Sequence, residues 1–224
     1  MTETAEKVLG KVTISQEIVK DIKKNVSNIT GFEKKIRDYS RQDTTDFLSA
    51  ILFGAINLES SDVHIEPQED RVRLRIRIDG ILRDVAHLPP KLVAAIVSRL
   101  KLLSRLKLNI TNAPQDGRFT IQTDSDPIEA RTSIVPAEFG EAAVLRILNP
   151  EVIAMELSDL GLRADDEEII MKELTRPNGM ILVTGPTGAG KTTTIYAFLK
   201  SIHTSAAKIV TIEDPVEYHL EGIE

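Results

Sequence analysis

The sequence has no cysteine among its 224 residues, which excludes disulfide bonds and any zinc site with cysteine ligands. The four histidines, at positions 64, 87, 203 and 219, do not have the spacing of metal ligands. Residues 1–20 mix charged and hydroxyl side chains with scattered apolar ones, so they lack the continuous apolar stretch of a signal peptide or a membrane span. We therefore expect no structural metal, no transmembrane segment and a cytoplasmic location.

The sequence also has no excess of basic residues over acidic ones. The formal net charge is -6, which gives no overall attraction to nucleic acid or to anionic lipid. We expect no nucleic-acid partner. The chain has 42% hydrophobic and 28% charged residues, a composition typical of globular proteins, and its length is enough for two domains.

The first part of the chain changes from a helical period to a strand period. Apolar residues recur every four positions from Ile14 to Val26, which predicts a short helix that ends near a breaker at 28–31, so residues 1–40 are expected to be an N-terminal helix and linker. Thr44 or Thr45 is expected to cap a second helix. Residues 41–150 then predict an α+β domain with an antiparallel sheet. Its expected strands are 62–66, 72–78, 81–85, 119–123, 128–135 and 142–148, with a helix from Pro90 to about Leu108.

The remaining residues, 151–224, predict the first part of an α/β domain. A helix is expected at about 165–175, followed by the unbroken apolar run 180–183, which is typical of a strand buried on both faces of a parallel sheet. A helix at 191–203 and a second strand at 208–212 complete a β-α-β order.

The residues between the first strand and its helix match the pattern G-x-x-x-x-G-K-[ST]. In this pattern glycines let backbone N–H groups converge on phosphate oxygens, and the helix adds its positive N-terminal end. The sequence therefore predicts an ATP site in which Lys191 reaches the β- and γ-phosphates and the Thr192 hydroxyl ligates Mg²⁺. The expected cofactor-binding residues are Gly185, Pro186, Thr187, Gly188, Ala189, Gly190, Lys191, Thr192 and Thr193.

Acidic residues follow the second expected strand, in the segment TIEDPVE at 211–217. Ligands bind at the carboxyl edge of a parallel sheet in open α/β folds, so acids at this edge can order Mg²⁺ or activate water. An ordinary solvated loop explains the same spacing equally well.

Four sequence blocks together resemble one known family. They are SDVHIEP at 61–67 with RIDG at 77–80, PQDGR at 114–118, the loop at 185–192 and the acidic segment at 211–217. In this order they are similar to the ATPases that drive type IV pilus assembly and retraction and type II secretion. The resemblance implies a PAS-like domain followed by a RecA-like P-loop ATPase domain.

The resemblance also implies roles for particular residues. The acidic segment is similar to the family's aspartate box, in which Glu217 would be the catalytic base and Asp214 and Glu213 would support the metal and water shell. In this family two arginines of the PAS-like domain reach the nucleotide phosphates. The resemblance implies that Arg131 and Arg146 are the matching residues here. Arginine suits this role because its planar guanidinium stays charged and can bind phosphate through two nitrogens.

Other charged residues of the strands are expected to be structural. Arg71, Arg73, Arg75 and Arg77 alternate along one strand, which is more typical of a solvated face or a subunit contact than of a catalytic site. His64 is likewise expected to have a structural role.

The family pattern continues beyond the aspartate box with a Walker B segment and a histidine box, which this sequence does not contain, so we expect a truncated or partial chain whose own ATPase activity is doubtful. The expected function is a hexameric motor subunit that binds ATP and Mg²⁺ and works at the inner membrane on a platform protein of a pilus or secretion system. One alternative is a non-catalytic nucleotide-binding or assembly module. A second is a DNA-translocating motor, against which the negative net charge argues.

Overall fold

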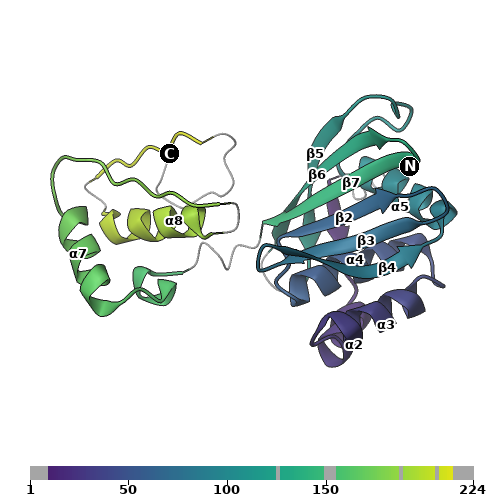
Figure 1. The fold of residues 1–224 in the computed structure, drawn as a ribbon, viewed down its shortest axis with the longest axis horizontal. Helices are drawn as coiled ribbons and strands as arrows, with labels where there is room; N and C mark the ends of the chain where they lie inside the picture. The colour runs from purple at the N-terminus through teal and green to yellow at the C-terminus, as the bar shows by residue number, and fades with distance from the viewer. Residues whose placement is uncertain (1–9, 125–126, 149–154, 187–188, 205–206, 214–224) are drawn as a thin grey trace. The chain divides into compact units, whose positions relative to one another are not determined.

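The computed structural model describes residues 10–124, 127–148, 155–186, 189–204 and 207–213. The chain divides into two compact units, residues 1–148 and 149–224 (Figure 1). Each unit is considered by itself below.

The first unit is built on one seven-stranded sheet with the order β1-β5-β6-β7-β2-β3-β4. All neighbouring strands are antiparallel except β1 and β5, which are parallel. The alternating segments of the sequence therefore do form an antiparallel sheet, as expected. The strands are β1 (Lys11–Thr13), β2 (Asp62–Pro67), β3 (Val72–Ile78), β4 (Ile81–Leu88), β5 (Gln115–Gln122), β6 (Ile128–Ala137) and β7 (Gly140–Leu148).

Helices cover one face of this sheet. They are α2 (Gln16–Asn25), α3 (Ile29–Tyr39), α4 (Thr44–Asn57) and α5 (Pro90–Leu103). α4 contacts α2, α3, α5 and β2, so it is buried along most of its length, from Phe47 to Ala55. The apolar alternates of the strands, such as Val63, Ile65 and Leu145, are fully buried against the helices, and the charged alternates point to the other face.

The β3–β4 hairpin turns where the sequence predicts it. Asp79 and Gly80 have φ angles of 51° and 76°. Two consecutive residues with positive φ are typical of a type I′ turn, whose twist matches that of the strands.

Two helix boundaries differ from the expected ones. α4 is capped by Asp43, whose carboxylate accepts hydrogen bonds from the N–H groups of Thr45 and Asp46 at 2.7 and 3.1 Å. α5 ends at Leu103 rather than near Leu108, because Arg105 has a φ of 58° and the N–H of Leu106 bonds back to the carbonyl of Lys101 at 2.7 Å. This is a Schellman ending with an arginine where glycine is usual, so the sequence carried no stop signal.

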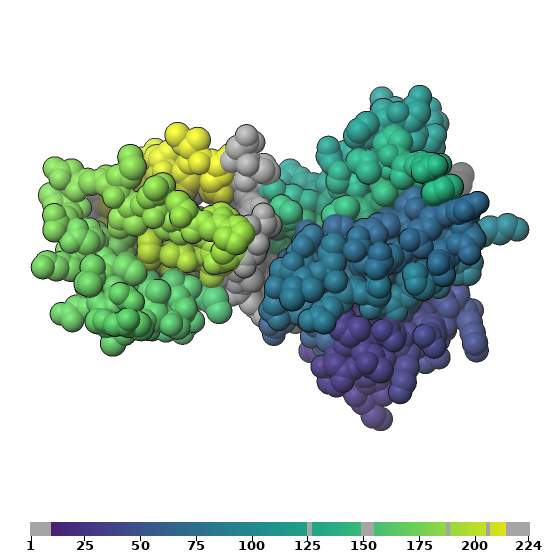
Figure 2. All heavy atoms as spheres, in the orientation of Figure 1, coloured from purple at the N-terminus to yellow at the C-terminus, as the bar shows by residue number. Residues whose placement is uncertain are grey.

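Residues 10–40 form part of the first unit rather than a separate helix and linker. β1 extends the sheet beside β5, and Asn28, expected to be a breaker, is instead the N-cap of α3, with its side chain accepting from Gly31 N–H at 2.9 Å. Phe32 and Ile36 of α3 are fully buried. In Figure 2 the purple atoms of α2 and α3 lie directly against the rest of the unit. Only the three residues 26–28 separate α2 from α3, which is why a single helix with a linker was expected.

The second unit contains the 3₁₀ turn η1 (Leu157–Leu160) and the helices α7 (Ala164–Leu174) and α8 (Lys191–Ile202). The two expected strands are not formed in its described residues. Met180 and Leu182 are 90% and 80% exposed, and within 208–212 only Ile209 makes an isolated bridge. A strand of a parallel sheet requires hydrogen-bonded neighbouring strands and side chains that cover both of its faces. Among the described residues of this unit, segment 180–183 has no neighbouring strand and is not covered on both faces.

Among the described residues, no helix has the length and apolar character needed to cross a membrane.

The packing of α3 on α4 is tested at Gly54. A Cβ at this position would lie 2.0 Å from a ring carbon of the buried Phe32. Replacing glycine by alanine inside a helix normally stabilises it by about 1 kcal/mol, but overpacking a rigid core costs about 1–3 kcal/mol, and the overlap here is severe. We expect Gly54→Ala to lower the urea midpoint followed by circular dichroism. Gly80→Asn is the control, because nothing lies within 4 Å of that position and asparagine tolerates positive φ. Equal midpoints for the two variants would show that α3 does not dock as described.

Candidate functional site

The first candidate group is the loop that leads into α8. Gly190 is the N-cap of α8 and has a φ of 84°, a left-handed conformation that glycine adopts without strain. Because Gly190 has no side chain to cap the helix, the first N–H groups of α8 remain available to a ligand. Gly185 packs closely inside the loop, where an added Cβ would meet the Cβ of Ala189 at 3.0 Å.

Lys191, the first residue of α8, folds back over this loop. Its ammonium donates hydrogen bonds to the carbonyls of Gly185 and Pro186 at 2.9 and 2.8 Å. Thr192 and Thr193 follow in the first helical turn. The first turn of α8 thus carries a lysine and two hydroxyl residues beside the helix N-terminus, and these residue types fit a phosphate chain and its magnesium ion. Thr187 and Gly188 lie outside the described residues.

Of the three acids of the expected aspartate box, Glu213 alone is described. The hydroxyl of Tyr196, a buried residue of α8, lies 3.1 and 3.0 Å from the two carboxylate oxygens of Glu213. Glu213 is therefore tied to the helix that follows the loop. Nothing in the sequence pattern indicated Tyr196. Asp214 and Glu217 lie outside the described residues.

The second candidate group lies in the first unit, on the face of the sheet opposite the helices. Strand register places Arg131 of β6 directly beside Arg146 of β7, so these two expected residues are brought together. The same register places Arg118 beyond Arg131, and Asp62 and then Arg77 beyond Arg146. One row across five strands therefore holds four arginines and one aspartate.

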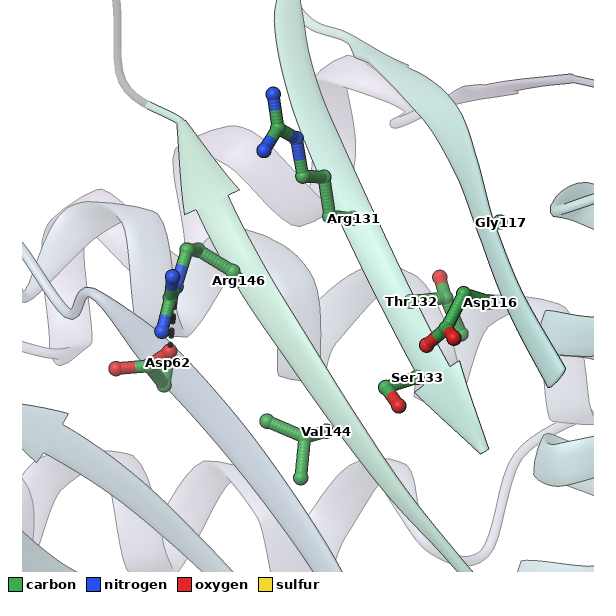
Figure 3. Close-up of a pocket in the computed structure, with 8 residues that line it drawn as sticks. All are labelled: Asp62, Asp116, Gly117, Arg131, Thr132, Ser133, Val144 and Arg146. Atoms are coloured by element: carbon green, nitrogen blue, oxygen red, sulfur yellow. Dashed lines mark hydrogen bonds and ion pairs between the residues drawn. The ribbon is translucent and has the colours of Figure 1, made fainter. Parts of the chain in front are cut away.

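A shallow pocket of about 310 Å³ opens along this row. Figure 3 shows Arg146 turned toward Asp62, with Arg131 on the neighbouring strand and Asp116 near Ser133. Asp62 and Asp116 were not expected as site residues, although both lie in sequence blocks that carried the resemblance. The pocket is lined by Asp62, Asp116, Gly117, Arg131, Thr132, Ser133, Val144 and Arg146.

The segment at 114–118 has a structural explanation. The side-chain amide of Gln115 donates to the carbonyls of Lys107 and Ile110 at 3.0 and 2.9 Å, which fixes the loop after α5. Gly117 approaches α5 so closely that a Cβ would lie 2.5 Å from the carbonyl oxygen of Ser104. Asp116 and Arg118 are thereby held on the open face, at the end of the arginine row.

The alternating arginines of β3 form ion pairs within the sheet. Arg73 binds both oxygens of Asp84, at 2.6 and 2.8 Å, and these hydrogen bonds lower the pKa of the Asp84 carboxyl. Arg75 pairs with Glu66. Burial lowers the pKa of His64, whose Nε2 has no hydrogen-bond partner in the described part of the chain. The ion pairs of Arg73 and Arg75 agree with the structural role expected for the alternating arginines of this strand.

Comparison with known proteins gives the family. A family model described as "Type II/IV secretion system protein" matches residues 38–224, most of the chain. The chain belongs to this family. It is 40% identical to the putative type II secretion system protein E of Escherichia coli K12 over 93% of the chain and 44% of that protein. It is also 40% identical to the type IV pilus assembly ATPase PilB of Acinetobacter baylyi over 79% of the chain and 31% of that protein.

The chain thus spans less than half the length of these curated members of the family. A solved structure, that of the Legionella pneumophila ATPase DotB, aligns with 82% of the chain and 50% of its own at 21% identity, with a TM-score of 0.44, too low to add to the assignment. Within the described residues there is no cluster of three histidine or acidic side chains that could hold a metal ion.

The floor of the pocket is tested at Thr132. Its Oγ1 accepts a 2.8 Å hydrogen bond from the hydroxyl of Ser104 on α5, and both residues are buried. Thr132→Val leaves the Ser104 donor unpaired and is expected to cost about 1–3 kcal/mol, whereas removing both partners is nearly neutral. Chemical denaturation of Thr132→Val, of Ser104→Ala and of the double variant measures this difference. Losses that simply add would contradict the hydrogen bond.

Proposed function

We propose that the chain is the nucleotide-binding part of a motor ATPase subunit that powers type IV pilus assembly or type II protein secretion. In this proposal residues 185–193 form a P-loop that binds ATP. The first unit serves as a PAS-like partner domain and the second as part of a RecA-like ATPase domain. The names of the relatives in this family, type II secretion system protein E and type IV pilus assembly ATPase, support this function.

The observation that carries the proposal is the position of Lys191. Its ammonium lies over the loop carbonyls at the N-terminal end of α8, next to backbone N–H groups that no side chain caps. A negatively charged phosphate chain is stabilised there by the lysine, by the N–H groups and by the helix dipole together. Lys191 would hold the β- and γ-phosphates, and the Thr192 hydroxyl would ligate Mg²⁺.

The acids and arginines take the roles that the family resemblance implies. Glu217 would act as the base that orients the attacking water, with Asp214 and Glu213 supporting it, and the bond from Tyr196 would fix Glu213. Arg131 and Arg146 would stabilise the charge that develops on the phosphates. Arginines that act in this way are worth about 10³ to 10⁵ in rate.

The assembly and its partners follow from the same proposal. A motor of this kind would work as a homo-hexamer in the cytoplasm, at the inner membrane, on a platform protein of the pilus or secretion system. Its force would come from a change in the angle between the two domains on ATP hydrolysis.

Lys191→Ala tests the nucleotide site directly. The change removes a charge-assisted hydrogen bond worth about 1.5–3 kcal/mol, so affinity for a fluorescent ATP analogue should fall about 10- to 100-fold. Lys200→Ala is the matched control, because Lys200 lies on the same helix but contacts Glu156 and Met155 instead of the loop. Equal affinities of the two variants would refute the P-loop assignment.

Glu217→Gln tests catalysis separately from binding. The amide keeps the size of the side chain but cannot accept a proton, so turnover should fall about 10²- to 10⁴-fold while nucleotide affinity is retained. Steady-state phosphate release is the measurement, made on the 224-residue chain and on a longer gene product that contains it. If Glu213→Gln or Asp214→Asn stopped turnover and Glu217→Gln did not, the base would be one of those residues. Binding without turnover in both proteins would favour the non-catalytic module.

A further inference from the structure

Asp62 is a buried carboxylate at the centre of the arginine row. It is the first residue of β2 and is 4% exposed. Strand register places it between Arg146 on β7 and Arg77 on β3. A carboxylate is stable in such a position only when it is paired with cations and hydrogen bonded.

Three groups satisfy this carboxylate. Its Oδ1 accepts from Nε of Arg146 at 3.2 Å, and its Oδ2 accepts from Nε of Arg77 at 3.1 Å and from the Ser61 hydroxyl at 2.9 Å. Each oxygen thus takes an arginine from a different neighbouring strand. Asp62 thereby joins β7 to β3 across β2.

The two arginines are not held equally. Arg77 also donates from Nη1 to the carbonyl of Gly80 at 3.0 Å, so it is fixed at the β3–β4 turn as well. Arg146 is 51% exposed at its side chain, and within the described residues Asp62 is the carboxylate with which it pairs. Ser61 and Arg77 therefore fix Asp62, and Asp62 in turn holds the more exposed Arg146.

The atom through which Arg146 is held has a chemical consequence. Asp62 takes the Nε–H of Arg146, and within the described residues the two terminal amino groups of Arg146 make no hydrogen bond. Those groups form the fork that binds two phosphate oxygens. A hold through Nε therefore fixes the direction of the side chain without using its phosphate-binding end.

We propose that Asp62 is the positioning residue of Arg146, which it holds through Nε so that the terminal nitrogens face an incoming phosphate. This inference rests on the proposed function of Arg146. It gives a role to an aspartate that the strand pattern placed among ordinary polar alternates. A lysine at position 146 could not replace the arginine. Arginine can bind Asp62 through Nε and a phosphate through its two terminal nitrogens, whereas lysine has a single ammonium nitrogen for both.

The first test is whether Asp62 holds Arg146 at all, and it needs no nucleotide. The Nε–H signal of Arg146 in the ¹⁵N spectrum, assigned with Arg146→Lys, is expected to be sharp in the wild-type chain and exchange-broadened in Asp62→Asn. Asp84→Asn is the matched control, since it breaks the Arg73 pair on the same face and should leave the Arg146 signal unchanged. An unchanged Arg146 signal in a folded Asp62→Asn chain overturns the inference.

The second test is whether the hold matters for turnover. Small misplacements of a catalytic group cost up to about 100-fold in rate, so Asp62→Asn is expected to lower kcat about 10- to 100-fold, with a much smaller change in KM, and Asp84→Asn to keep the wild-type rate. In an Arg146→Ala background, Asp62→Asn should have no further effect, because the residue through which it acts is gone. An equal loss in both backgrounds would mean that Asp62 is merely structural.

Two further outcomes are distinguished by other measurements: an Asp62→Asn chain that does not fold, and a failure of the proposed function itself. If Asp62→Asn does not fold, Arg146→Lys decides: the inference predicts a loss like that of Arg146→Ala, and wild-type turnover in Arg146→Lys overturns it. If the wild-type chain and the longer gene product both fail to bind and hydrolyse ATP, the proposed function fails instead, and the ¹⁵N spectrum still decides whether Asp62 holds Arg146.

Discussion

The register of β7 between β6 and β2 is the constraint on which the first unit depends. Ala143, Leu145 and Ile147 are the residues of β7 that face the helices, and a slip by one position would exchange them for Val144 and Arg146. Burial of the apolar set therefore fixes the register. The same register then places Arg146 beside Arg131 on one side and beside Asp62 on the other. The geometry of the candidate phosphate-binding row is thus a consequence of how the core packs on the opposite face.

A buried ion pair fixes the beginning of that strand. The ammonium of Lys101, on α5, lies 2.6 Å from a carboxylate oxygen of Glu141 and donates to the carbonyl of Ile110 at 2.7 Å, with Lys101 only 1% exposed. Burying a lysine is costly unless it is paired and hydrogen bonded, and both conditions are met here. Because Glu141 is the second residue of β7, the pair ties the strand to α5 and to the loop that leads into β5. The helix layer and the open face are therefore mechanically linked at one end of the sheet.

Much of the first unit could be predicted from the sequence, because most of its strands alternate apolar and polar residues and its hairpin has an Asp-Gly turn. The parts that could not be predicted lack a local signal. β1 is three residues long, so period-two alternation cannot be recognised in it, and Asn28 is equally suited to ending one helix and capping the next. Arg105 ends α5 in a conformation that usually belongs to glycine. The role of Asp62 is a property of three strands together, since its two arginines are 15 and 84 residues away in sequence.

In the second unit α8 begins at Lys191, where the sequence pattern predicts a helix, whereas the two expected strands are not formed among the described residues. A loop of this kind is specified by a few glycines and a lysine at fixed spacing, whereas a buried strand depends on neighbours from elsewhere in a sheet, and 180–183 has none among the described residues. The two candidate groups nevertheless share one physical arrangement. Lys191 is held by carbonyls of its own loop, and Arg146 is held by a carboxylate through one nitrogen. A flexible cation in water must lose side-chain entropy when it binds phosphate, and a cation that is already oriented loses less. In a chain with a net charge of -6, affinity for a polyanion cannot come from the overall field, so it has to come from cations that are fixed in place in this way.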